Sequence, residues 1–165
     1  MRIAIINALL IINIFALNLP KFFSASFTQT ITSKEKKITY KGNIYTNSKN
    51  VYWKYIYPNA KEIWITNEVT VYEPDLLQVT ISKKPKFNIF SLIKKAKKIG
   101  KNTYEAKIDG KKVTFIFDKT LKKAWYKDDV GNRVEIDFYN QSDKKIDPSI
   151  FKPKYPKDVD VIYQY

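Results

Sequence analysis

The chain has 165 residues, of which 44% are hydrophobic and 15% aromatic, and 30 Lys and Arg against 16 Asp and Glu give it a net charge of +14. It contains no Cys and no His, which excludes thiol nucleophiles, disulfides, cysteine-ligated metal sites and Ser-His triads and favours a binding protein without metal or cofactor over an enzyme. Arg2 and Arg133 are its two arginines, and because Arg makes the bidentate contacts with phosphate and guanine, the basic charge does not indicate nucleic-acid binding.

The first residues have the pattern of an export signal. A short positive start, Met1-Arg2, is followed by an apolar run that ends at Ala16 and is too short to span a membrane. We predict a signal peptide over residues 1–16, cleaved near Ala16, and a single domain over residues 17–165, a length that fits one core. The alternative is an amphipathic N-terminal helix that stays in the fold.

The next segment, Lys21 to Ser33, predicts a short helix. Phe23, Phe27 and Ile31 stand at i, i+4 and i+8, which places them in one apolar stripe on a helix. Pro20, just before the segment, fits the first turn of a helix.

From Lys37 onward the apolar period changes to two, the period of β-strands. Turn signals such as Pro58-Asn59 and Asp109-Gly110 separate the alternating runs, so we expect consecutive antiparallel strands joined by hairpins. The runs occupy residues 38–45, 51–57, 62–66, 69–72, 112–117 and 133–138. The last stretch contains Pro148, Pro153 and Pro156 and predicts an edge strand or an extended arm.

Residues 83–98 interrupt this pattern and predict a second helix of roughly 10 residues. The segment begins after Pro85, has an apolar face and ends in the basic cluster Lys94 to Lys98. This cluster would contact an acidic partner or phospholipid headgroups, or would form a solvated helix face.

The strand faces carry most of the 25 aromatic residues, 10 Phe, 12 Tyr and 3 Trp. A single curved sheet would gather these side chains on its concave side, where short helices would cover them. Tight packing of helices and sheet would give an ordinary core, whereas loose packing would enclose an apolar cavity of lipid size. The periodicity does not distinguish between the two.

Several segments together resemble the periplasmic outer-membrane lipoprotein carrier family (LolA). Residues 23–29 are similar to the F-x-A-x-F-x-Q signature of that family, and five such segments, this one included, stand in family order. They are residues 23–29, residues 42–58 with Gly42, Trp53 and Pro58, residues 64–72, residues 77–79, and Phe151 with residues 156–162.

The resemblance implies a mainly β fold with an α lid. In this fold a strongly curved, incompletely closed antiparallel β-barrel has short helices over its concave face. It also implies a monomeric periplasmic chaperone and no enzymatic activity. Its partners would be acylated lipoproteins, an inner-membrane ABC-type release complex and an outer-membrane lipoprotein receptor.

We assign the candidate site from the predicted faces. The outward positions are set by polar residues that should face water, namely Lys54, Glu62, Thr70 and Glu135. The residues expected to line the acyl-chain cavity are Val51, Trp53, Tyr55, Ile63, Ile65, Val71, Val113, Phe115, Val134, Ile136 and Phe138. Those expected on the inner surface of the lid are Phe23, Phe27, Ile31, Ile89, Phe90 and Ile93.

One position departs from the family pattern. Family members commonly carry Arg-Pro before the Trp strand, and the Arg latches the lid, whereas this chain has Lys49-Asn50. Lys49 would be a weaker latch, because Lys lacks the planar donor fork of Arg, or it would be a solvated turn residue.

Three other functions remain open from sequence. The outer-membrane receptor of the same pathway shares the fold, but it is a lipoprotein and requires a Cys. An exported carrier of another lipid or glycolipid would use the same half-barrel. A carboxylate-dependent glycosidase or a carbohydrate-binding module would use Asp128, Asp129, Glu135 or Asp137, although Asp128-Asp129 has the composition of a turn.

Overall fold

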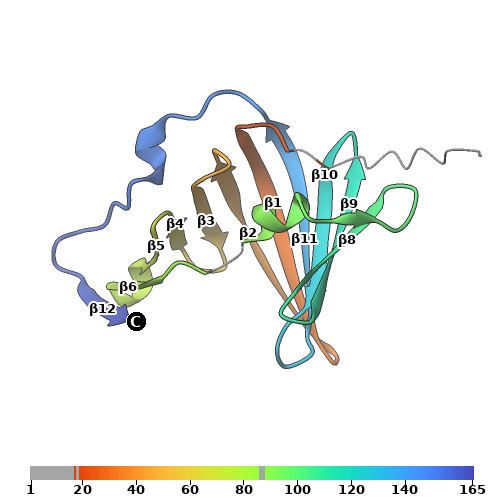
Figure 1. Ribbon diagram of the computed structural model, residues 1–165. Coiled ribbons are helices and arrows are strands. Elements are labelled where there is room, and N and C mark those ends of the chain that lie inside the picture. Colours follow the sequence, from red (N-terminus) through yellow and green to blue (C-terminus); the bar gives the residue numbers. More distant parts are fainter. Residues whose placement is uncertain (1–16, 18, 86–87) are drawn as a thin grey trace, which may run out of the picture.

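The computed structural model describes residues 17, 19–85 and 88–165, so the predicted signal peptide lies outside the described residues. Its strands form one sheet in the order β12-β6-β5-β4-β3-β2-β1-β11-β10-β9-β8-β7. The sheet is strongly curved, and the helix α1 (Ile89–Ile93) lies within the curve (Figure 1). The predicted class, a mainly β fold built on a curved, open sheet, is therefore confirmed.

The strands fall into two runs that meet where β1 pairs with β11. The first run is β1 (Phe23–Ser33), β2 (Lys36–Thr46), β3 (Val51–Tyr57), β4 (Lys61–Ile65), β5 (Glu68–Glu73) and β6 (Gln78–Lys83). The second is β7 (Lys97–Lys98), β8 (Thr103–Ile108), β9 (Lys111–Asp118), β10 (Thr120–Lys127) and β11 (Arg133–Ser142). The last strand, β12 (Asp160–Gln164), pairs in parallel with β6, so the sheet is not antiparallel throughout as predicted. Two 3-10 helices, η1 (Pro74–Leu76) and η2 (Pro148–Phe151), complete the elements.

The helix predicted over Lys21 to Ser33 is wrong, because this segment forms strand β1. Residues four apart share a face of a helix and also, because four is even, a face of a strand. Phe23, Phe27 and Ile31 therefore do lie on one face, but it is the concave face of the sheet rather than the underside of a lid.

The second predicted helix exists but has five residues, Ile89–Ile93, rather than about 10. Asn88 caps it by accepting hydrogen bonds from the backbone N–H groups of Phe90 and Ser91, both at 2.9 Å. The chain then leaves the helix, and part of the basic cluster forms the short edge strand β7.

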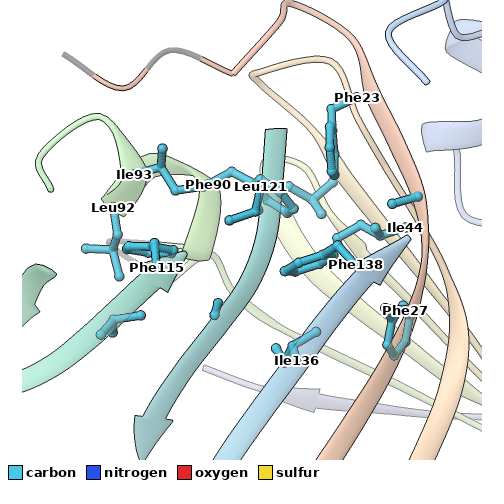
Figure 2. Close-up of a cluster of buried hydrophobic side chains, with 14 of the residues drawn as sticks. Phe23, Phe27, Ile44, Phe90, Leu92, Ile93, Phe115, Leu121, Ile136 and Phe138 are labelled. Carbon is cyan, nitrogen blue, oxygen red and sulfur yellow. The ribbon is translucent and has the colours of Figure 1, made fainter. Parts of the chain in front are cut away.

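The concave face holds the main hydrophobic core (Figure 2). Phe27, Ile44, Phe115 and Leu121 are fully buried there, and the side chains of α1 pack onto the same cluster. The ring of Phe90 lies 5.8 Å from Phe23, measured between centroids, so the helix contacts the sheet directly.

The convex face carries a second buried cluster, made by the C-terminal residues that follow β11. Figure 1 shows this segment passing around the outside of the sheet before β12. Phe151 and Val159 pack there against Tyr52, Trp64 and other side chains of β3 to β6. The indole N–H of Trp64 donates to the carbonyl oxygen of Ile150 at 3.1 Å, which fixes this C-terminal arm (residues 143–159) to the sheet.

Candidate functional site

The helix α1 does not fill the concave side, and the structure has open hollows there. One, the tyrosine hollow, has a volume of about 450 Å³, within the range of small-ligand sites. Strands β1 to β5 and η1 supply most of its wall, and the turn between β3 and β4 supplies the rest. Its residues are Gln29, Ile31, Tyr40, Tyr55, Asn59, Ala60, Lys61, Ile63, Glu73, Asp75 and Leu76.

A second hollow, the helix hollow, has a volume of about 370 Å³ and lies between α1 and strands β8 to β11. Ile89 and Leu92 of the helix face Val113 and Ile136 of the sheet across it. Its full wall is Asn88, Ile89, Leu92, Ile108, Asp109, Lys111, Val113, Tyr126 and Ile136.

The two hollows adjoin on the concave face. Gln29 lines the tyrosine hollow, Ile136 lines the helix hollow, and these residues are direct partners in the β1–β11 pair. Side chains of such partners lie about 5 Å apart on one face of a sheet. The two hollows therefore lie next to each other on the concave face, and we call them together the concave trough.

A small polar group lies on the floor of this trough. The hydroxyl of Tyr55 donates a hydrogen bond of 2.8 Å to the Oε1 atom of Gln29. Burial raises the pKa of Tyr55, with a further contribution from the nearby hydroxyl of Tyr126, so Tyr55 stays a neutral donor at all ordinary pH values. The ring of Tyr40 lies edge-on to Tyr55 at 6.1 Å, and Ile31 and Ile63 line the same hollow.

A third hollow of about 650 Å³ lies where the N-terminal segment meets the sheet, beside Leu19 and Leu121.

No helix among the described residues is long and apolar enough to cross a membrane. Within residues 17, 19–85 and 88–165, no group of three or more acidic side chains is placed to hold a metal ion.

Known proteins resemble this chain over most of its length. The outer-membrane lipoprotein carrier protein of Campylobacter jejuni is 36% identical over 154 residues, which cover 90% of this chain and 91% of that protein. The protein of the same name from Helicobacter pylori strain HPAG1 is 34% identical over 152 residues, covering 86% and 80%. The chain belongs to the outer-membrane lipoprotein carrier family.

A solved structure shares the fold of this chain. An uncharacterized conserved protein from Thermus thermophilus aligns with a TM-score of 0.57 and 13% identity, covering 88% of this chain and 92% of that one. No protein-family model matches the chain.

In this lipoprotein carrier homologue the predicted cavity residues share the concave face. All but Val71 belong to the concave core, and Val71 is half-buried opposite Ile63 in the β4–β5 pair. They divide into two groups, since Tyr55, Ile63, Val113 and Ile136 line hollows, whereas the others do not. Those others are Val51, Trp53, Ile65, Val71, Phe115, Val134 and Phe138.

The predicted lid residues are also split. Ile89, Phe90 and Ile93 do lie on the covering helix, and Ile89 borders the helix hollow. Phe23, Phe27 and Ile31 belong to the sheet instead, where Ile31 lines the tyrosine hollow. The hollows are also lined by Gln29, Tyr40, Leu92 and Tyr126, which were not among the predicted site residues. For Tyr40 a signal was present, because it follows Ile38 by two residues in an alternating run.

Lys49 lies in the turn between β2 and β3, with its side chain exposed. Its backbone N–H donates to Asn47 Oδ1 at 3.2 Å, as in a local turn. The neighbouring Ser48 connects this turn to the N-terminal segment, because its hydroxyl donates to the Lys21 carbonyl at 3.0 Å.

The carboxylates considered for a glycosidase have structural partners on other faces. Asp128 closes the β10–β11 turn by accepting hydrogen bonds from the backbone N–H groups of Val130 and Asn132. Glu135 and Asp137 both form ion pairs with Lys123 on the outer side of the sheet.

Proposed function

We propose that this chain is a periplasmic chaperone that binds the acyl chains of lipoproteins in the concave trough and carries them between membranes. The observation that carries the proposal is the pair of neighbouring hollows on the concave face, whose walls are more than half apolar or aromatic side chains. The helix α1 borders one of them, the helix hollow. The names of the curated relatives support the same cargo.

The physical chemistry of acyl chains favours a weak and reversible site. Each CH₂ moved from a bilayer into water costs roughly 0.8 kcal/mol, so a lipoprotein with several chains does not leave its membrane unaided. Non-covalent binding saturates near ~20 kcal/mol, so a carrier cannot extract such cargo by affinity alone. The carrier therefore has to shield chains that are released by another machine, and non-directional apolar walls suit both uptake and delivery.

The partners follow from this division of work. An inner-membrane ABC-type complex would release the lipoprotein, and an outer-membrane lipoprotein receptor would accept it. The carrier itself would act as a monomer in the periplasm, after removal of residues 1–16, and would catalyse no reaction.

The test is a release assay with spheroplasts that express an acylated lipoprotein or its unacylated form without the lipidated Cys. The purified chain is expected to release the acylated form alone into the medium. Release of both forms, or of neither, would contradict the proposal. Release with similar efficiency of unrelated glycolipids would support the alternative, an exported carrier of another lipid.

A pair of substitutions links the activity to the trough. Ile63→Trp places a large side chain in the tyrosine hollow, whereas Ile56→Trp makes the same change on the exposed side of β3. We expect the first variant to lose lipoprotein release at unchanged thermal stability and the second to retain it. Equal activity of both variants would show that lipoprotein release does not depend on the tyrosine hollow.

A further inference from the structure

Among the polar side chains of the tyrosine hollow, the amide of Gln29 stands on the floor beside Tyr55, where hydrocarbon binding does not use it. Gln29 stands on β1 between Phe27 and Ile31, on the concave face that is otherwise apolar along this strand. An amide in an apolar trough would weaken the binding of a hydrocarbon chain, because the chain displaces water from the amide and offers no hydrogen bond in exchange. Its position therefore calls for a polar ligand group.

The orientation of this amide is set by Tyr55. Because the Tyr55 hydroxyl donates to Oε1, the two N–H groups on Nε2 are left to act as donors. Nε2 has no hydrogen-bond acceptor among the described residues, and it is not among their fully buried unpartnered atoms, so it is open to the hollow.

The charged groups of the same hollow are already paired. Lys61 forms an ion pair of 2.8 Å with Glu73, and Asp75 accepts a hydrogen bond of 2.8 Å from the side chain of Asn59. A ligand in the hollow thus meets neutral N–H donors, and it meets no uncompensated cation. An anionic headgroup or a free carboxylate would instead lie near two acidic side chains.

We infer that Gln29, held by Tyr55, is a subsite for the neutral carbonyl of an acyl ester or acyl amide. The inference rests on the proposed function and adds the part of the lipid anchor that the trough recognises. An ester or amide carbonyl accepts hydrogen bonds and carries no charge, which matches the donors present. The hydrocarbon that follows the carbonyl then lies against Ile31, Ile63 and the tyrosine rings.

The experiment compares binding of dioctanoylglycerol with binding of its diether counterpart, dioctylglycerol, which has the same chains and no carbonyl. We expect the unmodified chain to bind the diester about fivefold more tightly, the value of one hydrogen bond of ordinary strength. Octanoate, which ends in a carboxylate, should bind more weakly than methyl octanoate. Equal affinity for diester and diether would overturn the inference.

Two variants on neighbouring positions complete the test. Gln29→Leu should remove the preference for the diester while leaving affinity for the diether unchanged or improved. Thr28→Val alters the adjacent residue, which faces the other side of β1, and should keep the preference. If Gln29→Leu folds poorly, Tyr55→Phe is the second variant. It removes the hydroxyl that orients the Gln29 amide and is expected to reduce the preference for the diester. A preference that survives both Gln29→Leu and Tyr55→Phe would also overturn the inference.

Failure of this subsite and failure of the carrier function give different results. A chain that binds neither lipid and releases no lipoprotein from spheroplasts would reject the proposed function. A chain that releases lipoprotein but does not distinguish diester from diether would reject the subsite alone.

Discussion

Gly42 of β2 lies directly opposite Phe27 of β1, and the ring of Phe27 occupies the space that a side chain on Gly42 would need. A Cβ at position 42 would stand 3.0 Å from the Phe27 ring and 2.0 Å from the carbonyl oxygen of Lys54 on β3. The missing side chain lets Phe27 meet Trp53 and Tyr55 across β2, with ring centroids 5.0 and 5.1 Å away. This contact joins the two sides of the concave core.

Gly42→Ala should therefore destabilise the protein by about 2–3 kcal/mol, since the obstructing atom belongs to the backbone and cannot move aside. Gly100→Ala is a matched control, because its Cβ would meet Thr103 at an ordinary contact distance of 3.5 Å and should cost less than about 0.5 kcal/mol. Denaturant unfolding of both variants measures the difference. Equal stability of the two would show that β2 and β3 can separate at this point.

The error at residues 21–33 shows which part of the fold the sequence could predict. The spacing of Phe23, Phe27 and Ile31 specifies a common face, and both a helix and a strand provide one. Thr28, Thr30 and Thr32 favour a strand, because β-branched side chains pack well on a pleated surface. The face was therefore predictable, whereas the element depended on pairing with β2 and β11, which are distant partners.

The convex cluster could not be predicted from alternation. Thr70 occupies an outward position and was expected to face water, yet it is buried beside Trp64, on the side that the C-terminal arm covers. Alternation assigns residues to two faces of the sheet, but it does not predict that a later segment of the chain covers the second face. The hollows could not be predicted either, because their volumes depend on the curvature of the sheet and, for the helix hollow, on the position of α1.

The cap of α1 controls how firmly the helix is held on the trough. Asn88→Ala removes two hydrogen bonds to the first turn of a five-residue helix, at an expected cost of about 1 kcal/mol. Hydrogen exchange at the α1 amides should become about fivefold faster, while exchange in β1 and β11 stays the same. Asn67→Ala, at an exposed turn position, is the control and should alter neither. Unchanged exchange in α1 would mean that packing of Phe90 and Ile93 alone determines its stability.

The C-terminal arm depends on the indole of Trp64. Trp64→Phe keeps the aromatic ring under the arm but leaves the carbonyl of Ile150 without its donor, which should cost about 1 kcal/mol. Limited proteolysis should then cut the exposed segment around Lys154 faster, before global unfolding. Trp125→Phe is the control, since Trp125 lies on the outer face with Arg133 4.2 Å above its ring, and its substitution should leave the arm protected. Equal cleavage rates in both variants would contradict the role of the hydrogen bond.

The ion pairs on the outer face of β10 and β11 predict a pH dependence of stability. The hydrogen bond from Lys123, and then that from Arg133 at 2.9 Å, lower the pKa of Glu135 below its ordinary value. A carboxylate whose pKa is lower in the folded state stabilises the fold above the unfolded pKa of about 4.3 and loses this contribution as the pH falls through its folded pKa.

Glu135→Gln should therefore reduce the free energy of unfolding by up to about 1 kcal/mol at neutral pH, the usual range for partly exposed pairs. The difference from the unmodified chain should shrink as the solution is acidified and vanish once Glu135 is protonated in both states. Lys123→Met provides the partner for a double-mutant cycle, and in its background the Glu135 substitution should cost less, because one of the two cations is gone. A difference that stays constant from neutral to strongly acidic solution would mean that Glu135 acts through packing rather than through its charge.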